Sequence, residues 1–216
     1  MGIAVKACAC SLFHALLRAG EHLIDDNKEF SPSIHITIAC VSHFTDPFGF
    51  ESTRLHIPWT KVRKEQGEDV VWTRQQHPTC PRQALDEHIR INNPLPHEHL
   101  FSYTTTGQNG GRKSLHRQSF LSAYNKAATL ASFSKVTGHC FRIGGTLEYL
   151  LRGHTFETVR ELGRWDGDSF RRYLRRHAFV LSPRLHDIDN LHTKFLKHCA
   201  QQEILDKDIG AEVSRS

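Results

Sequence analysis

The sequence predicts a mainly helical α+β protein with a small antiparallel sheet of three strands. Apolar residues recur every three or four positions near the N-terminus and through the C-terminal half, which is the period of amphipathic helices. An alternating run at 33–42 is typical of a strand. Two further runs, near 53–59 and 69–75, flank a polar turn with a glycine, which indicates a β-hairpin.

The first expected element is a helix over residues 3–19. Its apolar residues share one face: Val5, Leu12, Phe13, Leu16 and Leu17. The three strands follow, and the turn between the second and third has the sequence TKVRKEQGE. After a Pro-Thr-Cys-Pro break, a helix is expected to begin with Pro81 in its first turn, where proline is favoured.

The second half is expected to be helical after a flexible loop at 104–113, rich in glycine and threonine. One amphipathic helix is predicted over 119–130. Three shorter ones follow at 142–152, 155–162 and 167–177. Thr155 is a suitable N-cap for the middle one. A last apolar-periodic helix is expected beyond Pro183, within a single domain over 1–200, and 201–216 is expected to be a disordered tail.

Composition agrees with a soluble globular protein. The 216 residues are 38% hydrophobic and 24% charged, and no run of about 18 apolar residues predicts a membrane-spanning helix. Six cysteines without a Cys-x-x-Cys or a framework spacing favour a reduced, intracellular protein. Cys10 with His14, and His97 with His99, do not complete a set of four ligands, so neither a metal nor another cofactor is expected.

Positive charge is concentrated toward the C-terminal half. The net charge of +5 is compatible with nucleic-acid binding without requiring it. Between Arg152 and Arg176, seven arginines stand against four acidic residues. A solvated helix face is the ordinary outcome for such a run, but phosphate contact is favoured if a phosphate-cutting site lies beside it.

The segment 138–177 holds the groups that such a site needs, in order. His139 and Arg142 form a His-x-x-Arg pair, Gly163-Arg164-Trp165 follows, and Tyr173 lies in a basic amphipathic stretch. One His-x-x-Arg alone would mean little in a chain with 16 histidines. Together these groups resemble the active-site block of tyrosine recombinases and phage-type integrases, particularly integrases of eukaryotic, including fungal, mobile elements.

The resemblance implies a helical catalytic core and a complete set of roles. Arg18, in an Arg-x-x-Glu setting with Glu21, and Arg142 would clamp the scissile phosphate, because guanidinium groups stay charged and bind two oxygens at once. Glu21 would orient that site. Lys61 would be the general acid for the leaving 5′ oxygen, with Arg63 and Lys64 as alternatives on the same turn.

The remaining implied roles concern the nucleophile and the DNA. Tyr173 would attack the phosphate and form a 3′-phosphotyrosyl link without metal or ATP. His139 would accept the tyrosine proton or donate to a phosphoryl oxygen, and the Trp165 indole would donate one hydrogen bond. Five arginines would contact DNA: Arg164, Arg171, Arg172, Arg175 and Arg176.

Each of these residues also has an ordinary structural explanation. Tyr173 could be a helix residue with its ring in the core, Trp165 a core plug, Lys61 a solvated turn residue, and Arg18 with Glu21 a plain helical ion pair. Three other tyrosines fit the nucleophile less well: Tyr103, Tyr124 and Tyr149.

The resemblance also carries expectations for the whole protein. It implies double-stranded DNA as the partner, a homo-oligomer formed on DNA through the C-terminal helix, and a nuclear location. It further implies that the chain is truncated at its N-terminus, because relatives carry a helical domain upstream. Two alternatives stay open: a catalytically inactive DNA-binding remnant of a mobile-element integrase, and a helical interaction domain whose motif match is accidental.

Overall fold

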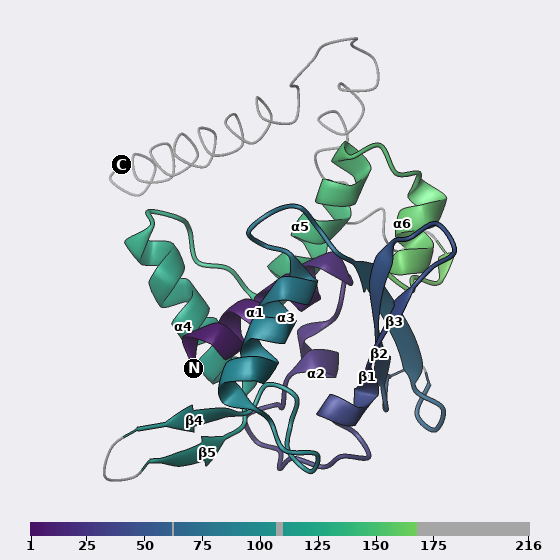
Figure 1. Ribbon diagram of the computed structural model, residues 1–216. Coiled ribbons are helices and arrows are strands. Elements are labelled where there is room, and N and C mark those ends of the chain that lie inside the picture. Colours follow the sequence, from purple (N-terminus) through teal and green to yellow (C-terminus); the bar gives the residue numbers. More distant parts are fainter. Residues whose placement is uncertain (62, 107–109, 168–216) are drawn as a thin grey trace, which may run out of the picture. The chain divides into compact units, whose positions relative to one another are not determined.

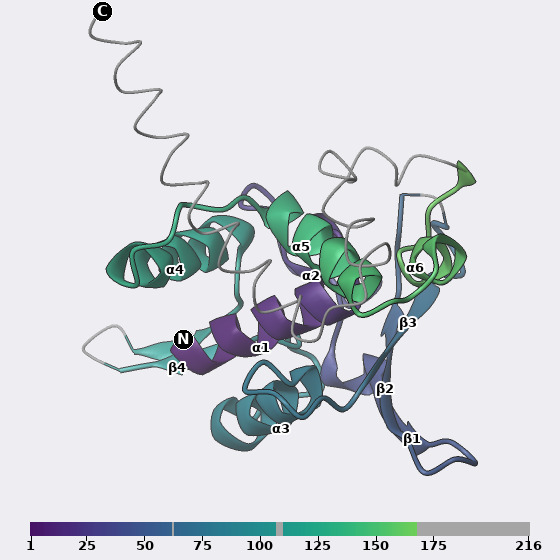
Figure 2. The same ribbon diagram turned by 90° about the horizontal axis from the view of Figure 1, so that it is seen from above.

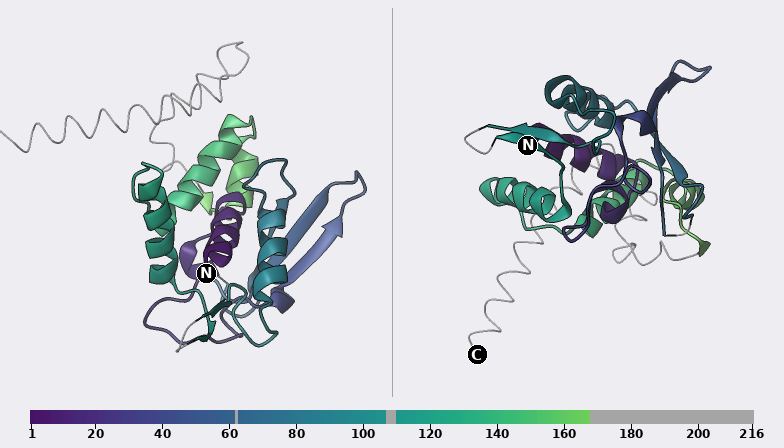
Figure 3. Two further views of the ribbon diagram at one scale, coloured as in Figure 1. Left: turned by 60° about the vertical axis from the view of Figure 1, so that its left-hand side comes forward. Right: turned by 90° about the horizontal axis from the view of Figure 1, so that it is seen from below.

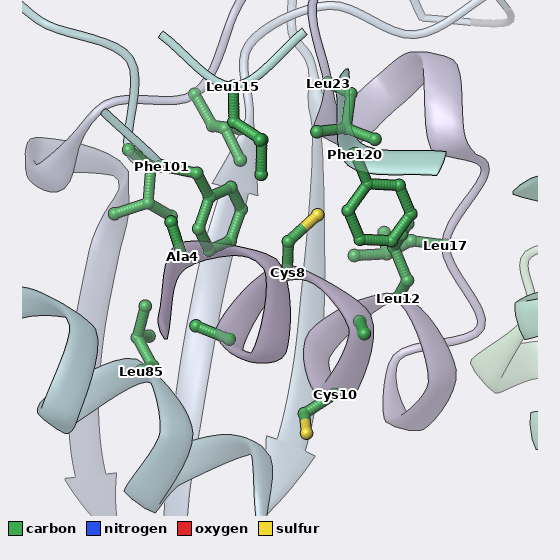
Figure 4. Close-up of a cluster of buried hydrophobic side chains, with 14 of the residues drawn as sticks. Ala4, Cys8, Cys10, Leu12, Leu17, Leu23, Leu85, Phe101, Leu115 and Phe120 are labelled. Carbon is green, nitrogen blue, oxygen red and sulfur yellow. The ribbon is translucent and has the colours of Figure 1, made fainter. Parts of the chain in front are cut away.

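The N-terminal helix forms the centre of the fold in the computed structural model, which describes residues 1–61, 63–106 and 110–167 (Figure 1). Helix α1 (Gly2–His14) lies between α3 (Pro81–Asn92) and α4 (Arg117–Leu130), as Figures 2 and 3 show. Ala4, Ala7 and Cys8 on α1 are fully buried, and such small side chains allow neighbouring helices to approach closely. Leu85, Phe101 and Phe120 gather around this helix (Figure 4).

Contacts divide the chain into two compact units. The first comprises residues 1–146 and 162–164, and the second contains 147–161 and 165–167 among its described residues. The sequence predicted one domain over 1–200. None of the helices in the described part of the chain is long and apolar enough to cross a membrane.

The predicted helix over 3–19 was wrong at its C-terminal end. Helix α1 stops at His14, and Leu16 takes a left-handed conformation with φ of 49° before the short α2 (Ala19–His22) begins. The Leu17 N–H still bonds to the Leu12 carbonyl at 3.0 Å. Apolar periodicity continues through this break because the residues after it are buried in the same core, so the pattern could not show where the helix ends.

The predicted three-stranded antiparallel sheet is confirmed. Strands β1 (Val41–Thr45), β2 (Glu51–Ile57) and β3 (Glu68–Thr73) pair in that order. Leu55 and Ile57 of β2 are fully buried. The polar segment between β2 and β3, residues 58–67 with 62 outside the described part, forms the turn that the sequence predicted and is called here the lysine turn.

The first strand lies later than the predicted 33–42. Residues Ile38–Cys40 form a 3₁₀ turn, and only from Val41 onward does the chain pair in the sheet. Ile36 is nevertheless fully buried, and its carbonyl accepts the Leu100 N–H at 2.9 Å. The alternation therefore does not mark a strand: Ile34 is exposed, and the buried residues 35–37 are consecutive in a loop that bonds to a distant segment.

The predicted loop at 104–113 was also only partly right. Strands β4 (Tyr103–Thr105) and β5 (Gly111–Lys113) form a two-stranded antiparallel hairpin. The Thr105 hydroxyl donates to the Gly111 carbonyl at 3.0 Å and accepts the Gly111 N–H at 3.2 Å. These side-chain bonds support a hairpin in a sequence of low strand propensity.

The helical predictions for the middle of the chain are confirmed. Helix α3 begins at Pro81, and α4 covers the predicted 119–130. Helix α5 (Gly138–Leu151) begins earlier than expected, and α6 (Phe156–Leu162) follows Thr155, whose hydroxyl accepts the Thr158 N–H at 3.2 Å as an N-cap. The helices predicted at 167–177 and beyond Pro183, and the tail, lie outside the described residues apart from position 167.

Candidate functional site

Arg142 is the most enclosed of the predicted site residues that the structure describes. Its side chain extends from α5, the residue is only 1% exposed, and it is the largest fully buried residue among those described. Nη1 donates to the Leu16 carbonyl oxygen, 126 positions earlier in the chain, and Nη2 donates to the Gly163 carbonyl oxygen, 21 positions later. Arg142 therefore joins three segments of the first unit: the α1–α2 connection, α5, and the residues that follow α6.

Glycines on α5 allow the helix to lie against the α1–α2 connection. A Cβ at Gly145 would stand 2.1 Å from the Phe13 carbonyl oxygen, and one at Gly138 would stand 2.7 Å from the Ala19 Cβ. Neither contact is sterically possible without movement, and the first would meet backbone. Because Gly138 and Gly145 have no side chain, α5 can lie close enough for Arg142 to reach the backbone of the Phe13–Leu16 segment.

Two residues with positive φ lie at or next to the carbonyls that Arg142 binds. Leu16 has a φ of 49° and supplies one of these carbonyls, and Arg164 has a φ of 55° and follows Gly163, which supplies the other. A residue with a side chain pays about 1–2 kcal/mol for this conformation. Such strain persists only where surrounding structure fixes it, and it is concentrated at functional sites.

Glu21 receives two arginines at the beginning of α2. Its Oε1 accepts the Arg18 Nη1 at 2.7 Å, and its Oε2 accepts the Arg164 Nη2 at 2.7 Å and the Arg18 backbone N–H at 3.2 Å. Burial by itself would raise the pKa of Glu21. The charge of Arg164 and the hydrogen bonds from Arg18 and Arg164 outweigh burial, so the pKa lies below its usual value and the carboxylate is ionised.

Arg18 keeps part of its surface in solvent. Its side chain is 41% exposed, although one guanidinium nitrogen is bound to Glu21. The predicted Arg18–Glu21 pair is thus present in the structure. Of the two arginines predicted to clamp a phosphate, Arg18 has a partly exposed side chain, whereas Arg142 is enclosed.

Arg164, predicted as a DNA contact, lies between two carboxylates. Its Nη2 reaches Glu21 at 2.7 Å and its Nη1 reaches Glu68, the first residue of β3, at 2.9 Å. The side chain is 12% exposed, and its Nε is buried without a hydrogen-bond partner among the described residues. In this conformation the guanidinium is committed to protein groups.

Lys61 and His139 are the exposed members of the predicted set within the described part of the chain. Lys61 lies in the lysine turn, next to the fully buried Thr60, whose hydroxyl accepts the Arg63 N–H at 3.0 Å. His139 lies in the first turn of α5, one helical turn before Arg142. Desolvation and then the charge of Arg142 lower the pKa of His139, which favours the neutral imidazole that can accept a proton.

The remaining predicted residues belong to the second unit or lie outside the described residues. Trp165 is buried and belongs to the second unit, where its backbone N–H bonds to the Arg160 carbonyl at 3.1 Å. Tyr173 lies outside the described residues. So do four of the predicted DNA contacts: Arg171, Arg172, Arg175 and Arg176. Among the alternative tyrosines, burial raises the pKa of Tyr149 to about 12, which disfavours its phenolate.

Sequence reasoning missed Glu68 and the carbonyls of Leu16 and Gly163. The adjacent Gly144 and Gly145 inside a helix are a signal, unused in the sequence analysis, that another segment approaches closely; a Cβ at Gly145 would meet the Phe13 backbone. Nothing in the sequence distinguishes Glu68 from an ordinary residue at the start of a strand.

A polar hollow of about 420 Å³ lies beside Arg164 in the first unit. Its lining comes from the lysine turn, the adjoining strand ends and Arg164 itself: His56, Arg63, Gln66, Gly67, Glu68, Asp69 and Arg164. Basic and acidic side chains both line it, and its ionisable groups are those of arginine, histidine and carboxylate residues. The described residues contain no group of three or more side chains able to hold a metal ion.

No protein-family model matches the sequence, and a search of curated proteins found no match either.

Proposed function

We propose that the protein cleaves and rejoins DNA strands as a tyrosine recombinase, in site-specific recombination or integration. The observation that supports this proposal best is the meeting of two sequence-distant arginine segments. Arg142 binds the carbonyl of Leu16, two residues before Arg18, and Arg18 is paired with Glu21. A chance motif match gives no reason for these two segments to come together.

The proposed reaction uses the two arginines, the turn lysine and the tyrosine. The Tyr173 oxygen attacks the scissile phosphorus, the new tyrosyl O–P bond forms, and the bond from phosphorus to the 5′ oxygen breaks. His139, favoured in its neutral form, takes the tyrosine proton, and Lys61 gives a proton to the leaving 5′ oxygen. Rejoining is the reverse exchange, and the phosphotyrosyl link conserves the bond energy. Arg18 contributes a charge whose orientation Glu21 fixes.

Arg142 is not accessible to a phosphate in this conformation. Each of its terminal nitrogens donates to a backbone carbonyl and the residue is only 1% exposed, so the surrounding structure would have to move before a phosphate could reach it. This burial favours the second candidate function, an inactive DNA-binding remnant in which Arg142 only joins segments of the fold. Double-stranded DNA is the partner in both cases, and assembly on DNA and a nuclear location belong to the same proposal.

The decisive experiment is to trap the covalent intermediate. The purified protein is incubated with nicked and supercoiled DNA at low salt and denatured, and DNA that carries bound protein is measured beside Tyr173→Phe and Tyr149→Phe. A tyrosine recombinase gives an adduct in the parent and in Tyr149→Phe and none in Tyr173→Phe. DNA binding without an adduct in any variant supports the remnant. If the protein does not bind DNA with an affinity that falls as salt rises, both the recombinase and the remnant are refuted.

A further inference from the structure

We propose that Arg164 is a positioning residue that fixes Arg18 and the lysine turn relative to each other, and that it does not contact DNA. This inference rests on the proposed function for its catalytic consequence. Its structural content, an ionic bridge between two elements of the first unit, can be tested independently of any reaction.

The geometry of Arg164 is that of a bridge. Its two terminal nitrogens point to carboxylates on different elements, Glu21 on α2 and Glu68 at the start of β3, at 2.7 and 2.9 Å. The side chains of Glu21 and Glu68 are 6% and 16% exposed, so solvent screens these contacts less than it screens surface pairs. The planar guanidinium fork suits two separate acceptors, which a single ammonium group would not match.

The bridge leaves Arg164 little to offer a phosphate. Each Nη donates one N–H to a carboxylate, Nε is buried, and the side chain is only 12% exposed. A DNA phosphate that took over one of these two N–H bonds would leave a carboxylate of low exposure without one of its arginines, which is costly. Exposure also distinguishes the two arginines: the side chain of Arg164 is 12% exposed, whereas that of Arg18 is 41% exposed.

Each end of the bridge leads to a residue with a proposed catalytic role. At one end, Glu21 is shared between Arg164 and Arg18, so Arg164 balances part of its negative charge and leaves Arg18 available for an anion. At the other end, Glu68 closes the lysine turn, and its second oxygen lies 3.7 Å from the Arg63 Nε on the same turn. The bridge thus holds the turn that carries Lys61 against the helix that Arg18 begins.

The backbone of Arg164 offers a clean substitution. Because its φ is 55°, Arg164→Gly removes the bridge without adding strain, and Arg164→Lys keeps the charge but lacks the fork. Glu68→Gln removes the negative charge at one end of the bridge and leaves Arg164 in place. Arg18→Ala serves as the control, since Arg18 is the arginine proposed to contact phosphate.

Two binding measurements separate positioning from DNA contact. For Arg164→Gly we expect DNA affinity and its salt dependence to match the parent, whereas Arg18→Ala should lower the salt slope by about one. Weaker binding with a slope lower by about one in Arg164→Gly would overturn the proposal. Hydrogen exchange should show faster exchange at the amides of Thr60, Arg63 and Glu21, which bond within the lysine turn and the first turn of α2. Unchanged exchange at these amides would equally overturn it.

The covalent-adduct assay tests the catalytic consequence of the bridge. Arg164→Gly should form adduct about tenfold to a hundredfold more slowly than the parent, as expected for misplaced groups at unchanged affinity, and Arg164→Lys should not restore the rate. A parental adduct rate in Arg164→Gly would overturn the positioning role. If the parent itself forms no adduct, the proposed reaction fails, and exchange at Thr60, Arg63 and Glu21 still decides whether the bridge fixes the two elements. Glu68→Gln should accelerate exchange in the lysine turn, which supplies this test if Arg164→Gly does not fold.

Discussion

A buried histidine makes the first unit sensitive to acid. His22 of α2 is 1% exposed, its ring lies 4.8 Å from the Phe101 ring between centroids, and its Nε2 lies 2.6 Å from the Ser11 hydroxyl oxygen. That hydroxyl also lies within hydrogen-bond reach of the Ala7 carbonyl at 2.9 Å, so it donates there and accepts from Nε2–H. The His22 Nδ1 is buried with no partner among the described residues, and a proton there would have no acceptor.

Desolvation lowers the pKa of His22 to about 3 from 6.5, with Glu21 opposing and Arg164 adding to the shift. The unfolded chain therefore binds this proton first as the pH falls. Stability from the neutral imidazole is complete above pH 6.5 and is lost progressively from there down to about 3. At pH 5, about 1.5 pH units below the unfolded-state pKa, the free energy of unfolding has fallen by about 2 kcal/mol. Burial also lowers the pKa of His99, which adds loss in the same direction.

The assay is denaturant unfolding of the parent and of His22→Gln at pH 7 and at pH 5. Glutamine can still donate to the Ser11 hydroxyl but does not titrate. The free energy of unfolding should fall between these pH values by about 2 kcal/mol more in the parent than in the variant. An equal fall in both proteins would show that His22 does not carry the acid sensitivity, and the burial argument would be refuted.

Three further predictions concern the candidate site. Gly145→Ala should destabilise the protein by about 1–3 kcal/mol in denaturant unfolding because its Cβ would meet the Phe13 carbonyl oxygen, whereas Gly20→Ala, with open space around it, should change stability little. Arg142→Met should lower the free energy of unfolding by about 2–4 kcal/mol because two buried carbonyls lose their donor, and a stability equal to the parent would contradict the enclosed geometry. Arg18→Ala should keep the parental melting temperature to within a few degrees and weaken DNA binding in a salt titration; an unchanged affinity would exclude Arg18 as a phosphate contact.

Local patterns predicted the parts of the fold that local interactions determine. The hairpin of β2 and β3 follows from two alternating runs around a polar turn, and the start of α3 follows from Pro81. The end of α1 did not follow, because the left-handed Leu16 is held by a bond from Arg142, 126 positions away. Sequence spacing can place an arginine on a helix, but it carries no information on such a partner.

The same limit applies to the candidate site. The Arg18–Glu21 pair is a contact within one helical turn, and its spacing predicted it. The role of Arg164 did not follow, because both of its carboxylate partners come from other elements and Glu68 belongs to no recognisable motif. Charge density around Arg164 favoured DNA contact, whereas tertiary packing turned its side chain toward Glu21 and Glu68.

The thiol of Cys8 can be used to follow the opening of the core around α1. Cys8 is fully buried on α1, and desolvation, with Cys10 nearby, raises its pKa well above the usual value, so thiolate forms there only when the helix separates from its neighbours. Cys140 at the start of α5 is half-buried, so a reagent should reach its thiol without opening of the core. The rate at which Cys8 is alkylated therefore reports how often the core opens, and a substitution that stabilises the core will lower this rate.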